Sequence, residues 1–199
     1  MILWNGNAGG PRAAPGKYKV RIIHGKDSLE KEFELKANPV YNCSQKDYEQ
    51  QFNFLISVRD KFNALQKTVK EIREIRVQMN AFAARLGKDY PKDLKEYADS
   101  LSKKMTEIEE AIYQTKLKSA QDILNYPIKL NDKIADLYNY AESGKTAPTK
   151  QVLEAFAELS ALADVEINKW ETMLKIDIPK LNTMFHANSL PVFGLGDKK

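Results

Sequence analysis

Histidine, the side chain that most often binds metals or transfers protons near neutral pH, is scarce in this sequence. The chain has two histidines: we expect His24 in a turn between two strands and His186 near the end of the last helix. The Glu-x-x-His pairs of four-helix di-iron proteins are absent, because Thr183 stands three residues before His186. We therefore predict a turn histidine, a solvated helix-end histidine, and no metal or other cofactor.

Cys43 is the single cysteine, so no internal disulfide can form. A catalytic thiol needs surroundings that lower its pKa, and a helix start near Cys43 would supply part of that. No histidine lies near it in the sequence, however, and we interpret Cys43 as a small residue in the joint, the segment that connects the predicted strands to the first predicted helix. The triplet Asn42-Cys43-Ser44 matches a glycosylation sequon, which matters only in a eukaryotic secretory pathway.

Carboxylates are abundant on the predicted helices, for example Glu109 and Glu110. Glycosidase chemistry needs two carboxyl groups aimed at one bond, and without a cleft such a pair is a solvated face. The basic run at residues 67–76 is interrupted by Glu71 and Glu74, which favours an exposed, ion-paired helix face over phosphate binding. We predict no catalytic residue in this chain.

Four aromatic residues are our candidates for contact with a partner or a glycan. Trp170 and Tyr138 fall on predicted helices, where each ring could stack on a sugar, although aromatic residues at helical spacing are more typical of a core. Tyr18 and Phe33 fall on one face of two predicted strands.

The composition sets limits on the class of protein. The 199 residues are 43% apolar and 29% charged, which is typical of a soluble globular protein. The 31 basic residues are mixed with 27 acidic ones, which argues against nucleic-acid binding. No apolar run is long enough to span a membrane, and residues 1–10 lack the features of a signal peptide. We infer either a cytosolic protein or a piece of a larger one.

Residues 1–40 read as a β-ribbon. Tyr18, Val20 and Ile22 alternate with basic residues, and after the turn "HGKDS" a second stretch alternates apolar residues with glutamates. These patterns predict a hairpin with one apolar face and with cross-strand ion pairs on the other. "ILW" near the start could be a third strand. A ribbon this small is only marginally stable alone, so we interpret residues 1–40 as the end of a truncated β-sandwich.

Residues 44–187 read as four helices. Ser44 is a good N-cap, and an apolar stripe then continues to Gly87, which predicts a helix about 60 Å long. A second helix starts near Pro91, a third runs from Pro127 to Gly144, and a fourth follows "KTAPT" and is kinked or interrupted at Pro179.

The expected fold class is therefore mainly α, an antiparallel bundle of two long and two shorter helices, with a flexible tail at residues 188–199. At the break between the second and third helices we expect Asn125 to cap, Tyr126 to be extended and Pro127 to lie in the first turn. This break would lie partway along one leg of the bundle, so that two helices match one long one.

Several blocks of this sequence resemble the C-terminal region of bacterial sortilin-like, BNR-repeat, glycosyl-hydrolase-like proteins. The blocks are "GGPRAAPGKYKVRI", "NPVYNCSQKDYEQQFNFLISVRD", "SAQDILNYPIKLNDKIADL" and "APTKQVLEAFAELSALAD", which together cover most of the chain. The resemblance implies a β-propeller and part of an immunoglobulin-like β-domain upstream, of which residues 1–40 would be the truncated end, with any glycosidase-like chemistry on the propeller. It also implies export, hence a periplasmic or extracellular location.

Our leading hypothesis is a non-catalytic C-terminal module that packs on or orients the propeller, or binds a partner. Two alternatives stay open at this point: an accessory wall of a glycan-processing site, and a stand-alone helical adaptor for protein interaction.

Overall fold

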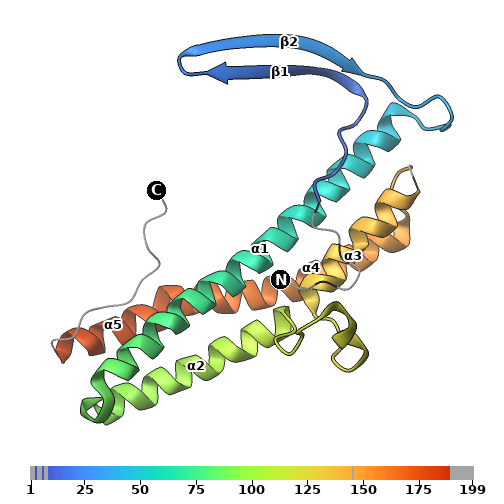
Figure 1. The fold of residues 1–199 in the computed structure, drawn as a ribbon. Coiled ribbons are helices and arrows are strands. Elements are labelled where there is room, and N and C mark those ends of the chain that lie inside the picture. Colours follow the sequence, from blue (N-terminus) through green and yellow to red (C-terminus); the bar gives the residue numbers. More distant parts are fainter. Residues whose placement is uncertain (1–2, 4–5, 7–8, 145, 189–199) are drawn as a thin grey trace.

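The structure, a computed structural model, describes residues 3, 6, 9–144 and 146–188. It confirms a mainly helical chain with a small N-terminal sheet (Figure 1). Of the predicted tail, all but Asn188 lies outside the described residues, as do Ile2 and Trp4 of the suggested third strand; Leu3 is described and is not in a strand.

Helix α1, Gln45–Leu86, is one uninterrupted helix of 42 residues. It begins where predicted, because Ser44 and Asp47 form a reciprocal capping box: the Asp47 backbone N–H donates to Ser44 Oγ at 3.2 Å, and the Ser44 N–H donates to Asp47 Oδ2 at 2.8 Å. It ends at Gly87, whose φ of 52° suits a residue without a Cβ. The buried side chains of α1 follow the predicted stripe, and Leu65, Ile72 and Ile75 are fully buried.

Helices α2, Lys92–Ile112, and α3, Leu130–Ser143, follow one another along α1. Figure 1 shows α2 beside the later half of α1 and α3 beside its earlier half, with a loop between them. This arrangement confirms that two helices together match the long one, and α3 stops at Gly144 as predicted.

The detail at residues 125–127 differs from the prediction. A short 3-10 turn, η2, Ala120–Leu124, precedes them, and Asn125 closes that turn by donating its backbone N–H to Asp122 O at 3.0 Å. Helix α3 starts only at Leu130, so Asn125 does not cap it and Pro127 is not in its first turn. Instead the Pro127 carbonyl accepts from Gln114 Nε2 at 2.9 Å, which ties the loop to the end of α2.

The last leg consists of α4, Lys150–Thr172, and α5, Ile178–Ala187, joined by a π-helical turn, η3, Met173–Asp177. The predicted interruption is therefore one wide turn, placed just before Pro179. Pro179 has no N–H to donate to the carbonyl of Lys175, four residues earlier, as an α-helix would require. In a π turn the hydrogen bonds run five residues back, as from Ile178 N–H to Met173 O, so the Lys175 carbonyl does not need the N–H that Pro179 lacks.

The bundle core extends along the whole of α1. Phe54 meets Phe156 of α4 near the start of α1, and Phe82 meets Phe185 of α5 near its end, both edge-to-face with ring centroids 5.3 Å apart. The connection from α1 to α2 is short and contains the 3-10 turn η1, Gly87–Asp89, whereas α2 is joined to α3 by the longer segment 113–129.

Two buried glutamates link α1 to its neighbours. Glu109 of α2 is 4% exposed and is bound by Arg73, at 2.7 Å, and by Arg76, both from α1. The expected solvated face is therefore wrong for Glu109 and holds only for the exposed Glu110. Glu71 of α1 is also buried, and its Oε2 accepts from Trp170 Nε1 at 3.0 Å. Both carboxylates fix the register of α1 against another helix.

Strands β1, Gly16–His24, and β2, Asp27–Leu35, form the two-stranded antiparallel sheet found in the described residues. Gly25, with φ of 59°, and Lys26 make the two-residue turn between them. Tyr18 pairs with Phe33 and Lys19 pairs with Glu32, which confirms the predicted separation of an apolar and a charged face. The helices pack on one another, whereas the strands pack mainly on each other and project from the bundle as an arm (Figure 1).

Candidate docking surface

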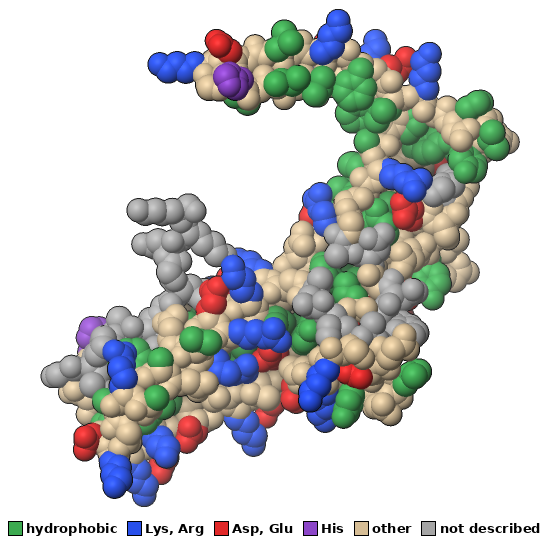
Figure 2. Space-filling model, viewed as in Figure 1, with side chains coloured by type: hydrophobic (Ala, Val, Ile, Leu, Met, Phe, Trp, Pro, Cys, Tyr) green, Lys and Arg blue, Asp and Glu red, His purple; other side chains and the backbone are tan. Residues whose placement is uncertain are grey.

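Six apolar side chains of the hairpin share one face with Lys31, which pairs with Val20, and we call the six the hairpin apolar face. Directly paired residues of antiparallel strands share a face, so the register collects them on one side. Its members are Tyr18, Val20, Ile22, Leu29, Phe33 and Leu35. Figure 2 shows hydrophobic side chains gathered along the arm.

Exposure of this face is unusually high for large apolar side chains at paired strand positions. Leu29 is 69% exposed and Ile22 is 63% exposed, whereas Tyr18 is half-buried. Tyr18 is the exception because its hydroxyl donates to the Ala14 carbonyl at 2.6 Å and its ring stacks on Phe33 with centroids 5.9 Å apart. A group of exposed apolar side chains of this kind typically marks an interaction site.

The opposite face of the hairpin, which we call the hairpin charged face, confirms the predicted cross-strand ion pairs. Lys19 Nζ lies 3.2 Å from Glu32, Arg21 is paired with Glu30, and Lys17 stands opposite Glu34. Exposed pairs of this kind contribute about 0 to 1 kcal/mol each, so they orient the ribbon more than they stabilise it. The hairpin is thus amphipathic, with its apolar side uncovered.

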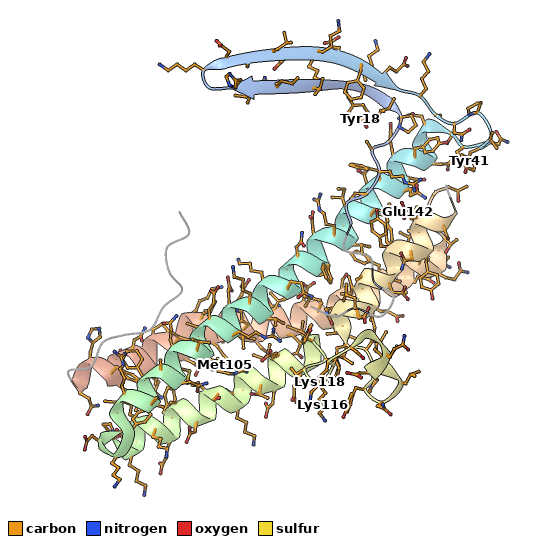
Figure 3. All side chains as sticks on the ribbon, viewed as in Figure 1. Tyr18, Tyr41, Met105, Lys116, Lys118 and Glu142 are labelled. Carbon is orange, nitrogen blue, oxygen red and sulfur yellow. The ribbon has the colours of Figure 1, made fainter. Side chains whose placement is uncertain are left out.

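The base of the arm is fixed to the bundle by several polar contacts. Gln45 Nε2 donates to the Pro15 carbonyl at 2.9 Å, Tyr138 Oη donates to Gly10 O at 2.9 Å, and Arg12 Nε lies 3.3 Å from Glu142 Oε1. Figure 3 labels Tyr18, Tyr41 and Glu142 around this joint. A cavity of about 360 Å³ lies there, lined in part by Tyr41 and Glu142. These contacts set the direction in which the hairpin apolar face points.

A second concave surface lies between α2 and α4, beside the π turn. This groove has a volume of about 720 Å³, an apolar floor that includes Ile108 and Met173, and charged walls that include Lys104 and Asp177. Tyr97 Oη donates to Asp177 Oδ1 at 3.1 Å, and burial, followed by this hydrogen bond, raises the pKa of Tyr97. The walls mix both charges and show no nucleophile–base pair, so the groove defines no reaction.

Two of the four predicted contact residues lie in the core. Trp170 is 1% exposed and Tyr138 is 2% exposed, so neither offers a ring face to a sugar, and the more typical core role applies. Burial also raises the pKa of Tyr138. Tyr18 and Phe33 are brought together on the hairpin apolar face.

The residues considered for metal binding or nucleophilic catalysis are not assembled into a site. His24 closes β1 at the tip of the arm and His186 lies in α5, so the structure keeps them apart (Figure 1). Among the described residues, no group of three histidine, cysteine, aspartate or glutamate side chains is placed to hold a metal ion. Cys43 is half-buried in the joint. No helix in the described part of the chain is both long and apolar enough to cross a bilayer.

Sequence reasoning missed the groove at the π turn and the cavity at the joint. The groove depends on how far α2 and α4 stand apart, and the cavity depends on how the segments before β1 and after β2 lie against α1, for which the chain carries no local signal. Comparison of the chain with protein-family models, with curated proteins and with solved structures found no match.

Proposed function

We propose that this chain is a non-catalytic module whose helical bundle is a stiff support and whose β1–β2 hairpin docks on a β-rich partner. The observation that carries the proposal is the exposure of the hairpin apolar face, with Leu29 at 69% and Ile22 at 63%. A two-stranded ribbon is marginal in water, and a covering layer would supply the burial it lacks.

The resemblance to sortilin-like, BNR-repeat proteins suggests which partner this is. In that setting the hairpin packs on β-structure of the same parent polypeptide, and the bundle orients or braces the propeller on the outside of the cell. The glycan-wall alternative loses its helical candidates, because Trp170 and Tyr138 are buried.

The size of the surface favours a partner that is covalently connected. Stable complexes between free proteins bury at least about 1,200 Å² in total. Nine-residue strands about 30 Å long, two strands wide at about 5 Å spacing, offer roughly 300 Å² on one face, or about 600 Å² in total when a partner contributes an equal area. A connected partner needs less area, because the connection raises its effective concentration.

The test is a photo-crosslinker placed at Phe33 in the protein as the source cells make it. We expect the crosslinked peptide, identified by mass spectrometry, to derive from a β-strand segment outside the helical bundle. The matched control carries the same group at Glu32, on the hairpin charged face, and we expect no such product from it.

A crosslink from Phe33 that joins only to α1–α5 would overturn the proposal, because the hairpin would then cover its own apolar face. Absence of any crosslink from Phe33 would overturn it as well, provided that the protein is intact and photolysis is complete.

A further inference from the structure

The two free edges of the hairpin differ in charge, and this difference carries an inference about the partner. On the hairpin charged face, β1 presents only basic side chains apart from Ile23, and β2 presents only acidic ones apart from Ser28. The basic residues are Lys17, Lys19 and Arg21, and the acidic residues are Glu30, Glu32 and Glu34.

The backbone groups that remain free belong to the same residues. In a hairpin with a two-residue turn, the pair that closes the turn, here His24 and Asp27, exchanges hydrogen bonds, and such pairs alternate along the ladder. The residues between them point their N–H and C=O groups outward. On β2 those are Ser28, Glu30, Glu32 and Glu34, so a strand that joins β2 aligns its own paired residues opposite the glutamates.

Position in the fold distinguishes the two edges. In Figure 1, β1 lies on the side of the arm nearer the bundle and β2 lies on the far side. A sheet of several strands therefore has room to extend from β2, whereas from β1 it would grow toward α1.

From these observations we infer that β2 is a strand-addition edge for a partner β-strand with basic side chains on its polar face and apolar side chains on the other. Its lysines or arginines lie opposite Glu30, Glu32 and Glu34. Its apolar residues extend the hairpin apolar face beside Leu29, Phe33 and Leu35, and also lie against the aliphatic stem of Lys31 between Leu29 and Phe33. The inference rests on the proposed docking function and specifies the chemistry of the partner.

A second copy of this chain fits the edge poorly. Two β2 strands related by a twofold axis would align glutamates opposite glutamates, and like charges directly opposite one another are destabilising. Pairing of β2 with β1 of another copy would match charges, but it is a head-to-tail contact that does not close and would build filaments.

The experiment uses the full chain, labelled with nitrogen-15, and two nine-residue capped peptides at concentrations of about 1 mM or more, which match the effective concentration of a connected partner. Both peptides alternate valine with a charged residue, which is lysine in one and glutamate in the other. We expect the lysine peptide to slow hydrogen exchange at the outward amides of Glu30 and Glu32 without changing those of Lys19 and Arg21. We expect the glutamate peptide to bind at least about tenfold more weakly, since three cross-strand pairs change from attractive to repulsive.

A charge-swap variant is the matched control. It combines Lys17→Glu, Lys19→Glu and Arg21→Glu with Glu30→Lys, Glu32→Lys and Glu34→Lys, which keeps every cross-strand pair but inverts each edge. In this variant the glutamate peptide should be the one that protects β2.

Equal binding of both peptides, protection of β1 instead of β2, or no protection at all would overturn the inference. Filaments that lengthen with the concentration of the chain alone would also overturn it and would assign the edge to a second copy. None of these outcomes depends on the Phe33 crosslink. If that crosslink forms equally in the charge-swap variant, docking through the hairpin apolar face stands and only the edge assignment falls.

Discussion

The bundle and the hairpin are built from the same kind of amphipathic pattern, but the apolar face is buried in the bundle and exposed in the hairpin. In the bundle, Leu65 of α1 and Leu101 of α2 are fully buried, because helices cover one another on several sides. In the hairpin, Leu29 and Ile22 stay mostly exposed, because two strands have no second layer. Apolar periodicity therefore marks surfaces that require a cover, and only the structure distinguishes a surface covered within the chain from one that is available to a partner.

A glutamate of the bundle core and a glutamate of the hairpin differ as the apolar side chains do, the first being buried and the second exposed. Glu109 in the bundle is buried and bound by two arginines, whereas Glu32 in the hairpin is an exposed half of a surface pair. We expect substitutions in the bundle to act on stability and substitutions in the hairpin to act on association.

The largest expected effect is that of Trp170→Ala. Removing a side chain that is 1% exposed should lower the free energy of unfolding by about 3 to 5 kcal/mol. Trp170→Phe keeps most of the ring but loses the hydrogen bond to Glu71, and should cost about 1 to 3 kcal/mol. Chemical denaturation followed by circular dichroism measures both. An unchanged midpoint for Trp170→Ala would mean that the end of α4 is not packed on α1.

Next is Glu109→Gln, which leaves Arg73 and Arg76 without their shared carboxylate. We expect a loss of about 1 to 3 kcal/mol, less than for a fully buried pair, because the Arg73 side chain is 51% exposed. Glu110→Gln, one residue away and exposed, is the control and should change stability by less than about 0.5 kcal/mol. Equal effects of the two substitutions would remove the distinction between a buried and a solvated carboxylate.

A smaller effect is expected at the start of α1. Ser44→Ala removes the side-chain acceptor of the capping box and should cost about 1 kcal/mol of the free energy of unfolding. An effect below about 0.2 kcal/mol would mean that α1 frays at this end and leaves the joint loosely held.

The same cap predicts a dependence on pH. Hydrogen bonds from the Ser44 hydroxyl and backbone N–H hold the pKa of Asp47 below its ordinary value of 3.8. A lowered pKa in the folded state stabilises the fold above 3.8, and this contribution is lost as the pH falls from there through the folded-state pKa. Denaturation curves should show a shallower loss in this window for Asp47→Asn than for the parent, and an identical loss would contradict the assignment.

The smallest expected effect on folding is in the hairpin. Phe33→Ser and Ile22→Ser should change the free energy of unfolding of the bundle by less than about 0.5 kcal/mol, because both side chains face solvent. Thermal unfolding monitored by helix content measures this. A loss of 1.5 kcal/mol or more would show that the face is already covered in the free chain, and the contrast between the two regions would disappear.

Much of the fold could be predicted from local signals. Ser44 and Gly87 mark the ends of α1, and the alternating pattern around Tyr18 and Phe33 predicts the two faces of the hairpin. These features depend on capping groups, glycine conformation and strand periodicity, all of which act within a few residues.

What could not be predicted depends on contacts between distant segments. Glu109 reads as solvated because a charge on a helix usually is, and its burial follows from two arginines 33 and 36 residues earlier in the chain. Proline at position 179 predicts an interruption but not its form, and Pro127 resembles a helix start that the structure places at Leu130. For the candidate docking surface, the apolar face was predictable, whereas its exposure required the structure.

The uninterrupted α1 also has a mechanical consequence. At 42 residues it is a strut about 60 Å long, with the hairpin joint at one end and Phe82, packed on α5, near the other. If the hairpin is held fixed, a rotation of about 10° at the joint displaces the far end of the bundle by about 10 Å. Small rearrangements among Gln45, Arg12 and Glu142 would thus be amplified into a displacement large enough for a pair of distance probes to resolve.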